Sequence, residues 1–268
     1  MADMITLTAE DQVTETTKVT TGYFTGGVGN LAGSNFTTSS LVAGEKKYYY
    51  NIQHSSEDQF SVAYGHIAGS GSQSGSTANK VGQTEAVYRQ FASLLLKPEE
   101  INGGFIINGV SQSSCHFFIA ERARMKDRIN KKNWTLHLSG SNTTGTGSSL
   151  RLTDDSEYSS SVATVVGPRF NVVSGSAGTK VGTTIFGHFY PKMGTIVLST
   201  SQLSASLPGS SSNNEVTTLG AMTHPGFHED PTVDAENALK FVKTLQLGTD
   251  TSFRSCLLYT SDAADEVV

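Results

Sequence analysis

The residues best suited to bind a metal ion lie in one short segment near the end of the chain. His224, His228, Glu229 and Asp230 bring two imidazoles and two carboxylates close together in sequence. Two histidines four residues apart can share one face of a helix and bind zinc, but the Pro-Gly pair between them disfavours that helix. The segment is either a loop metal site or a solvated loop before a helix. We expect the loop, with no metal and no other cofactor.

Other residues that could do chemistry do not form a complete catalytic set. Cys115 directly precedes His116, but adjacency in the chain does not place an imidazole on a thiolate, and the apolar residues that follow indicate burial. Asp154 and Asp155 lie beside turn formers and need no catalytic role. Residues 27–33 resemble a phosphate-binding loop, yet they have one residue too many and no βαβ context. The chain also contains no G-x-S-x-G motif. We therefore expect that the protein is not an enzyme.

Charge and hydropathy disfavour nucleic-acid and membrane partners. The formal net charge is −5 and only 16% of the residues are charged, so we expect no nucleic-acid surface. The most charged stretch, residues 121–132, is interpreted as an exposed strand end and turn, although a basic contact surface is the alternative. No apolar run reaches the ~18 residues of a membrane-spanning helix, and we expect no membrane contact.

Periodicity predicts a mainly β protein with sandwich-like antiparallel sheets. Gly, Ser and Thr are abundant, and these residues favour strands and turns over helices. Apolar and polar residues alternate along short segments separated by turn formers, which predicts strands at residues 46–53, 59–67, 104–107, 116–123, 134–138, 150–153, 169–173, 183–189 and 195–199. We expect few helices among them.

Two segments have helical periodicity. In residues 84–96, apolar side chains recur at spacings of three and four, Thr84 is a suitable N-cap, and Pro98 follows. A shorter helix is predicted at 234–247, capped by Asp234 and ended by Gly248. We expect four regions: an extended polar arm at 1–40, a β-rich structural domain at 41–207, a loop and helix at 208–255 that begin a further, truncated region, and 256–268.

The last region resembles the translation of a transposase-based sequencing adapter. The match runs through the consecutive residues 256–266, which read CLLYTSDAADE. We therefore interpret the natural reading frame as interrupted near Ser255. No functional argument should depend on the residues after Ser255, including the second cysteine, Cys256.

Several sequence blocks resemble a large virion structural protein of contractile-tailed phages, especially phages of marine cyanobacteria. They cover about half of the chain and occur in the expected order: FSVAYG at 60–65, VYxxF with LLL at 87–96, RARMKD at 122–127, NWxLxL at 133–138, LTDDS at 152–156, NVVSG at 171–175 and YPxxGxIVL at 190–198. Members of this family usually continue well beyond the length seen here. The resemblance implies a tail or baseplate component without known catalytic residues, made in the host cytoplasm and located in the virion.

The resemblance leads to two expectations about function. The first is a structural subunit that works through homo- or hetero-oligomeric contacts with other virion subunits, with the Thr-rich arm docking on a neighbour by strand addition. The second is a receptor- or carbohydrate-binding fibre domain, in which Tyr48, Tyr49 and Tyr50 would form a platform for a sugar. A tail-associated hydrolase would need a pair of acids or a nucleophile with a base, and the sequence shows neither.

Overall fold

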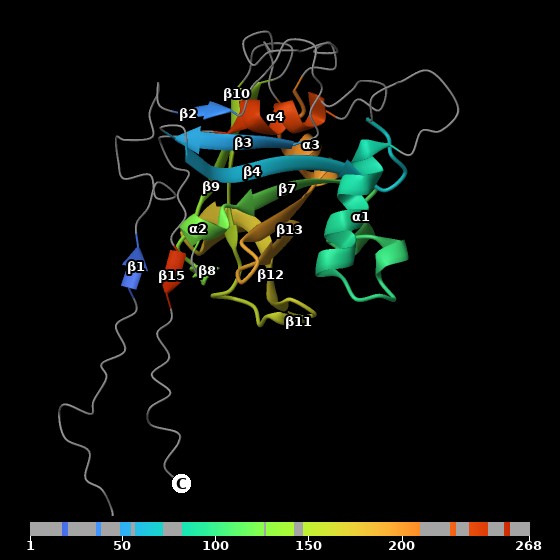
Figure 1. The fold of residues 1–268 in the computed structure, drawn as a ribbon. Coiled ribbons are helices and arrows are strands. Elements are labelled where there is room, and N and C mark those ends of the chain that lie inside the picture. The colour runs from blue at the N-terminus through green and yellow to red at the C-terminus, as the bar shows by residue number, and fades with distance from the viewer. Residues whose placement is uncertain are drawn as a thin grey trace, which may run out of the picture.

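The computed structural model describes residues 18–20, 36–38, 49–54, 57–71, 82–125, 127–141, 147–209, 226–228, 236–245 and 255–257. One large antiparallel sheet dominates the fold (Figure 1). Its strands are, in spatial order, β2 (Phe36–Thr38), β3 (Tyr49–His54), β4 (Glu57–His66), β7 (Ser114–Ala120), β14 (Thr195–Ser199), β13 (Thr179–Tyr190), β12 (Gly167–Ser176), β10 (Gly147–Asp154) and β9 (Leu136–Ser141). A short strand, β11 (Val162–Thr164), pairs with β12 outside this path.

Two small sheets and a few helices complete the described elements. β5 (Ile106–Ile107) and β6 (Val110–Ser111) form a hairpin, and β15 (Ser255–Leu257) lies between β1 (Lys18–Thr20) and β8 (Arg128–Ile129). We assign no function to β15 because the adapter-like segment begins at Cys256. The helical elements are α1 (Gln83–Leu95), η1 (Ile101–Gly103), α2 (Arg122–Met125), α3 (Thr200–Ser206) and α4 (Glu236–Thr244).

Both faces of the central strands are buried, and alternate residues along each strand face opposite sides. On β7, Phe118 packs in the core of the concave face, called the inner core, while Cys115 and Phe117 pack in a second cluster on the convex outer face. On β14, Leu198 faces the inner core and Val197 faces outward. These strands therefore read as nearly continuous apolar runs, as expected for a sheet that is covered on both sides.

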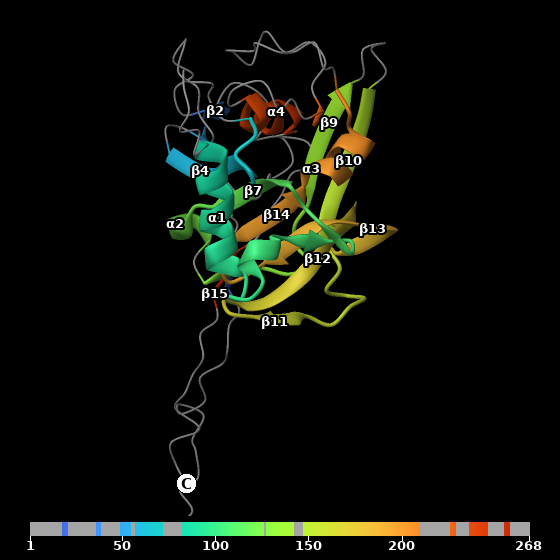
Figure 2. The same cartoon turned by 90° about the vertical axis from the view of Figure 1, so that its right-hand side faces the viewer.

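The sheet curls so that its two ends flank one helix. α4 contacts β3 and β4 near one end and β9 at the other, and Leu245 just after it bridges to Leu138 of β9. Figure 2 shows β4 and β9 on opposite sides of α4. The prediction of a mainly β, antiparallel and sandwich-like protein is confirmed, and here one curled sheet supplies both layers.

α1 covers part of the outer face through a close contact with β4. A Cβ atom added at Gly65 would lie 2.8 Å from the backbone nitrogen of Tyr88, so only glycine allows the helix to lie this near the strand. Tyr88 is fully buried, and its hydroxyl donates to the carbonyl of Gln112 at 2.6 Å and accepts from the amide of Phe105 at 3.0 Å. These bonds join α1 to the segment that precedes β7.

The structure corrects several details of the sequence interpretation. The helix predicted at 84–96 is α1, but its N-cap is Gly82, and the hydroxyl of Thr84 instead donates to the carbonyl of Ser70. Leu94, one of the apolar residues at three- and four-residue spacing in 84–96, is 42% exposed, whereas Ala92 is buried. The stripe on α1 is therefore rotated from the predicted one because the helix approaches β4 at Gly65.

The predicted boundary at residue 208 does not separate two cores. Phe227 and the apolar residues of α4 belong to the same inner core as the main sheet. The helix predicted at 234–247 is α4, while Asp234 and Gly248 lie outside the described residues. Most of the predicted 1–40 arm also lies outside them, although β2 forms an edge of the main sheet. In the part of the chain that the structure describes, no helix is both long and apolar enough to cross a bilayer.

Candidate ligand-binding pocket

Two loops and strand β12 border an open pocket at the end of the sheet that contains β10 and β12. The pocket has a volume of about 500 Å³, and we call it the rim pocket; it is lined by Lys131, Ser156, Glu157, Tyr158, Ser159, Ser160, Ser161 and Phe170. Most of these side chains come from the turn between β10 and β11, where polar turn formers follow Asp154 and Asp155. The pocket therefore has polar, hydroxyl-rich walls.

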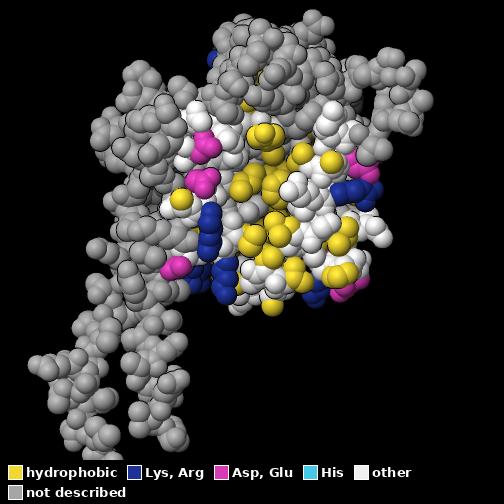
Figure 3. All heavy atoms as spheres, viewed as in Figure 1, with side chains coloured by type: hydrophobic (Ala, Val, Ile, Leu, Met, Phe, Trp, Pro, Cys, Tyr) yellow, Lys and Arg dark blue, Asp and Glu magenta, His cyan; other side chains and the backbone are white. Residues whose placement is uncertain are grey.

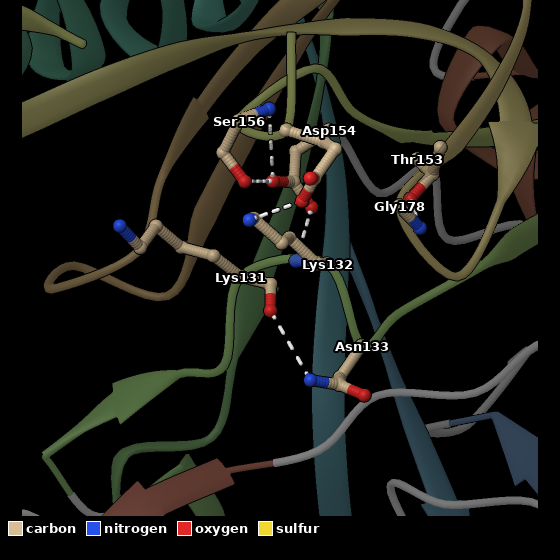
Figure 4. Close-up of polar contacts among 8 residues, drawn as sticks. Lys131, Lys132, Asn133, Thr153, Asp154, Ser156 and Gly178 are labelled. Carbon is tan, nitrogen blue, oxygen red and sulfur yellow. Dashed lines mark hydrogen bonds and ion pairs between the residues drawn. The ribbon is translucent and has the colours of Figure 1, made fainter. Parts of the chain in front are cut away.

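Asp154 holds these two loops together. It is completely buried, and one carboxylate oxygen accepts the backbone amide of Lys132 at 2.9 Å while the other accepts the amide and the hydroxyl of Ser156 (Figure 4). Lys132 has a φ of 63°, a conformation that L-residues rarely adopt. The bond to Asp154 helps to stabilise this turn, and Lys132 also pairs through its ammonium with Glu157.

Asp155 fixes the other side of the same turn. Its carboxylate accepts the backbone amide of Asn171 at 3.0 Å and the side-chain amide at 2.9 Å. Its carbonyl accepts the amides of Tyr158 and Ser159 at 2.8 and 3.0 Å. The two adjacent carboxylates thus accept hydrogen bonds from within the protein.

The hairpin between β12 and β13 packs against the Lys132 loop beside the pocket. A Cβ atom at Gly178 would lie 2.8 Å from the Cα of Lys132, and its φ of +81° also favours glycine. The amide of Gly178 donates to the hydroxyl of Thr153 at 2.8 Å, and that hydroxyl donates to the carbonyl of Trp134 at 2.9 Å. These contacts join the hairpin to the Lys132 loop.

Two ammonium groups lie over aromatic rings at this pocket. The Nζ of Lys131 is 4.9 Å from the centre of the Phe170 ring, and the Nζ of Lys180 is 5.5 Å from that of Tyr158. Both distances are in the range of cation–π attraction. Tyr158 is 54% exposed, so it presents a large aromatic surface to solvent.

The charged stretch 121–132 contains two short elements, α2 and β8, and ends beside the rim pocket. Met125 and Ile129 are buried and anchor α2 and β8, whereas the sequence interpretation was an exposed strand end and turn. Because these two apolar side chains pack in the inner core, the charged stretch lies against the sheet. Lys131, near its end, lines the rim pocket.

The candidate metal segment is only partly described. His224 and Glu229 lie outside the described residues, and His228 is exposed, with its carbonyl accepting from the ammonium of Lys240 at 2.6 Å. Within the described residues, no three side chains of the metal-binding types lie close enough to hold an ion. The structure therefore adds no support for a site at His228.

Cys115 and His116 point to opposite sides of the sheet, so they do not form a nucleophile–base pair. Cys115 is buried in the outer cluster. Nδ1 of His116 lies 3.0 Å from the Thr200 hydroxyl and Nε2 lies 3.1 Å from the Asn237 carbonyl. The tautomer with hydrogen on Nε2 satisfies both contacts. Burial lowers the pKa of His116 to about 3, which keeps the ring neutral.

A second polar group on the sheet was not recognised in the sequence. His188 and Tyr190 of β13 are buried. Burial lowers the pKa of His188 to about 3, and the positive charge of Arg169 lowers it further. Burial raises the pKa of Tyr190 to about 12, although Arg169 acts in the opposite direction. Among the described residues, His188 Nδ1 and Arg169 Nε have no hydrogen-bond partner. Only the antiparallel pairing of β12 with β13 brings these residues together.

The sequence interpretation did not include the rim pocket. The available signal was an aromatic residue, Tyr158, inside a run of serines between two predicted strands. The predicted sugar platform at Tyr48–Tyr50 does not form, because Tyr50 is buried in the inner core and only Tyr49 is exposed, while Tyr48 lies outside the described residues. Comparison with known proteins found no matching family model, no matching curated protein and no matching solved structure.

Proposed function

We propose that this chain is a structural subunit of a tailed-phage virion, in the tail or baseplate, that acts through contacts with neighbouring subunits and has no catalytic activity. The ordered sequence blocks support the phage assignment. The observation that carries the assembly role is the outer face of the main sheet, which α1 covers only in part.

Apolar side chains remain accessible on this outer face. Ile119, Val166, Ile185 and Met193 pack at the margin of the outer cluster and are only half-buried. Figure 3 shows hydrophobic side chains gathered over the centre of this view of the molecule, beside α1. Contiguous apolar surface of this kind is typical of protein–protein contact sites.

Further large apolar residues are exposed on the adjoining edge elements. Val181 of β13 is 85% exposed, and Val162 and Val165 in and beside β11 are 49% and 58% exposed. β11 pairs only with β12 among the described strands, so its other edge can accept a strand from a neighbour. The Thr-rich N-terminal segment is our candidate for that added strand.

The outer surface is tested by replacing exposed apolar residues with lysine. We expect Val165→Lys with Val181→Lys to abolish association of the chain with itself or with the products of genes that adjoin its own on an uninterrupted contig. Thr184→Lys is the matched control, because Thr184 is a polar residue that is also exposed on β13. Association that survives the double substitution would contradict a role for this surface, and a neighbourhood without tail genes would contradict the phage assignment.

The arm is tested by a deletion that leaves the sheet intact. Because β2 pairs with β3, deletion of residues 1–40 would remove an edge strand as well as the arm. Deletion of residues 1–17 ends before the first described strand. We expect it to reduce incorporation into particles while the melting temperature stays within a few degrees of the full chain. Normal incorporation would exclude strand addition by this segment.

A further inference from the structure

We infer that the rim pocket binds an acidic saccharide, a sugar that carries a carboxylate. This site is separate from the apolar outer face and goes beyond the proposed assembly function. Asp154 and Asp155 hold the loops that form the pocket walls in place, by hydrogen bonds with Lys132, Ser156 and Asn171. Because these walls are already ordered, a ligand does not have to order them on binding.

The exposed groups of the pocket match the two kinds of surface that a sugar presents. The hydroxyls of Ser159, Ser160 and Ser161 can each donate and accept hydrogen bonds, as the hydroxyls of a sugar do. The hydroxyl of Ser156 donates to Asp154 and can still accept a hydrogen bond from a ligand. The half-exposed ring of Tyr158 offers an apolar plane for the C–H face of a pyranose. A ligand that was wholly apolar would leave the serine hydroxyls without partners.

The charges at the pocket favour an anionic ligand. Glu157 is paired with Lys132, so its charge is compensated. Lys131 and Lys180 lie over rings, and neither has a carboxylate within ion-pair distance among the described residues. The carboxylates of Asp154 and Asp155 are buried beneath the turn and accept hydrogen bonds from the protein. A carboxylate on the ligand would complement the ammonium groups of Lys131 and Lys180.

The same residues favour binding over hydrolysis. Glycoside hydrolysis generally uses two carboxyl groups on opposite sides of the scissile bond. Asp154 and Asp155 are buried and occupied by amides, and Glu157 is the one carboxylate that lines the pocket. The described residues that line the pocket therefore supply one carboxylate, Glu157, and it is ion-paired with Lys132.

The test uses the full chain and two probes that differ in one group. Methyl β-D-glucuronide carries a carboxylate where methyl β-D-glucoside carries a hydroxymethyl group, and binding of each is followed by NMR titration; an array of acidic and neutral glycans identifies the preferred sugar. We expect acidic glycans to bind and the glucuronide to bind more tightly than the glucoside. Absence of binding to all acidic glycans, or equal binding of the neutral and acidic forms, would overturn the inference.

Three variants assign any binding to this pocket. Tyr158→Ala is expected to weaken binding about tenfold or more, whereas Tyr49→Ala is the matched control because Tyr49 is equally exposed, at 56%, on β3. Lys131→Gln is expected to lower the affinity for the glucuronide about two- to fivefold and leave that for the glucoside unchanged. Binding that is insensitive to Tyr158→Ala and to Lys131→Gln would place the ligand elsewhere and overturn the site. Subunit association, measured separately on the same variants, should not change.

Discussion

His116 in the inner core and Asp154 beside the rim pocket are both almost completely buried, yet they lie in different surroundings. His116 is enclosed by the rings of Tyr64, Phe227 and Phe241, whose centres are 5.0 to 5.5 Å from its own. Asp154 lies under a turn whose other side is open to solvent. In the core, both ring nitrogens of His116 have hydrogen-bond partners within the protein, and aromatic rings surround the imidazole. At the pocket, the buried carboxylates hold a turn whose remaining hydroxyls and ring face outward.

This difference shows that burial alone does not identify a functional residue. The buried polar groups of both regions are structural, and the residues free to bind a ligand are the exposed ones that the buried groups position. If this is correct, changes in the core should affect stability strongly, changes at Asp154 should affect stability and binding together, and changes at Tyr158 should affect binding alone. The predictions below follow this order.

Acidification should have the largest effect, because it acts on two buried histidines at once. Burial lowers the pKa values of His116 and His188 to about 3 in the folded chain, against about 6.5 when unfolded. Below about pH 6.5 the unfolded chain therefore binds protons that the folded chain does not, and stability falls as the pH decreases towards 3. The free energy of unfolding should decrease by at most about 1.4 kcal/mol per pH unit for each histidine.

Chemical denaturation between pH 7 and pH 4 measures this effect. In His188→Phe the loss per pH unit attributable to histidine should be about half of the wild-type value, because one of the two titrating rings is absent. A free energy of unfolding that stays constant from pH 7 to pH 4 would mean that the two rings are not enclosed as the structure shows.

Truncation of a ring in the inner core should have the next largest effect. Phe241 is fully buried and packs against His116 and Phe227. Phe241→Ala should lower the free energy of unfolding by about 3–5 kcal/mol, from lost burial and the cavity left behind. Urea denaturation measures the loss, and Phe241→Leu, which retains most of the volume, should lose clearly less. A loss below about 1 kcal/mol for the alanine variant would contradict the assignment of α4 to the core.

Removal of the Asp154 carboxylate should have an intermediate effect on stability and a clear effect on the pocket. Asp154→Ala leaves the part-buried amide of Lys132 and the Ser156 hydroxyl without their acceptor, which costs about 1–3 kcal/mol. Thermal unfolding measures the loss, and sugar titration should show weaker binding because the turn is no longer held. Ser156→Ala, which keeps the carboxylate, serves as the milder comparison. Unchanged stability would show that Asp154 does not organise the two loops.

The smallest expected effect on stability is that of Tyr158→Ala. Its ring is more than half exposed and lies at the pocket, so the free energy of unfolding should change by no more than about 0.5 kcal/mol. Differential scanning calorimetry of this variant beside Tyr49→Ala provides the comparison. A loss above about 2 kcal/mol would show that Tyr158 is a packing residue and would remove the contrast between the two regions.

The sequence could predict those features that depend on neighbouring residues. Strict alternation in residues 134–138 and the apolar run at 195–199 indicated strands, and they lie in or adjoin β9 and β14. The three- and four-residue spacing between Tyr88, Phe91 and Leu95 indicated α1. Local periodicity reports which side of an element is apolar, because only that side can be buried at a gain in free energy.

The sequence by itself determined the β-rich class, most of the strands and both main helices, since these depend on residues a few positions apart. The tertiary structure alone decided that the sheet curls around α4, that Asp154 and Asp155 turn inward, and that the loops at Lys131 and Tyr158 meet Phe170 at one pocket. These features depend on contacts between residues far apart in the chain, and the residue pattern of one segment does not specify which distant segment it will contact.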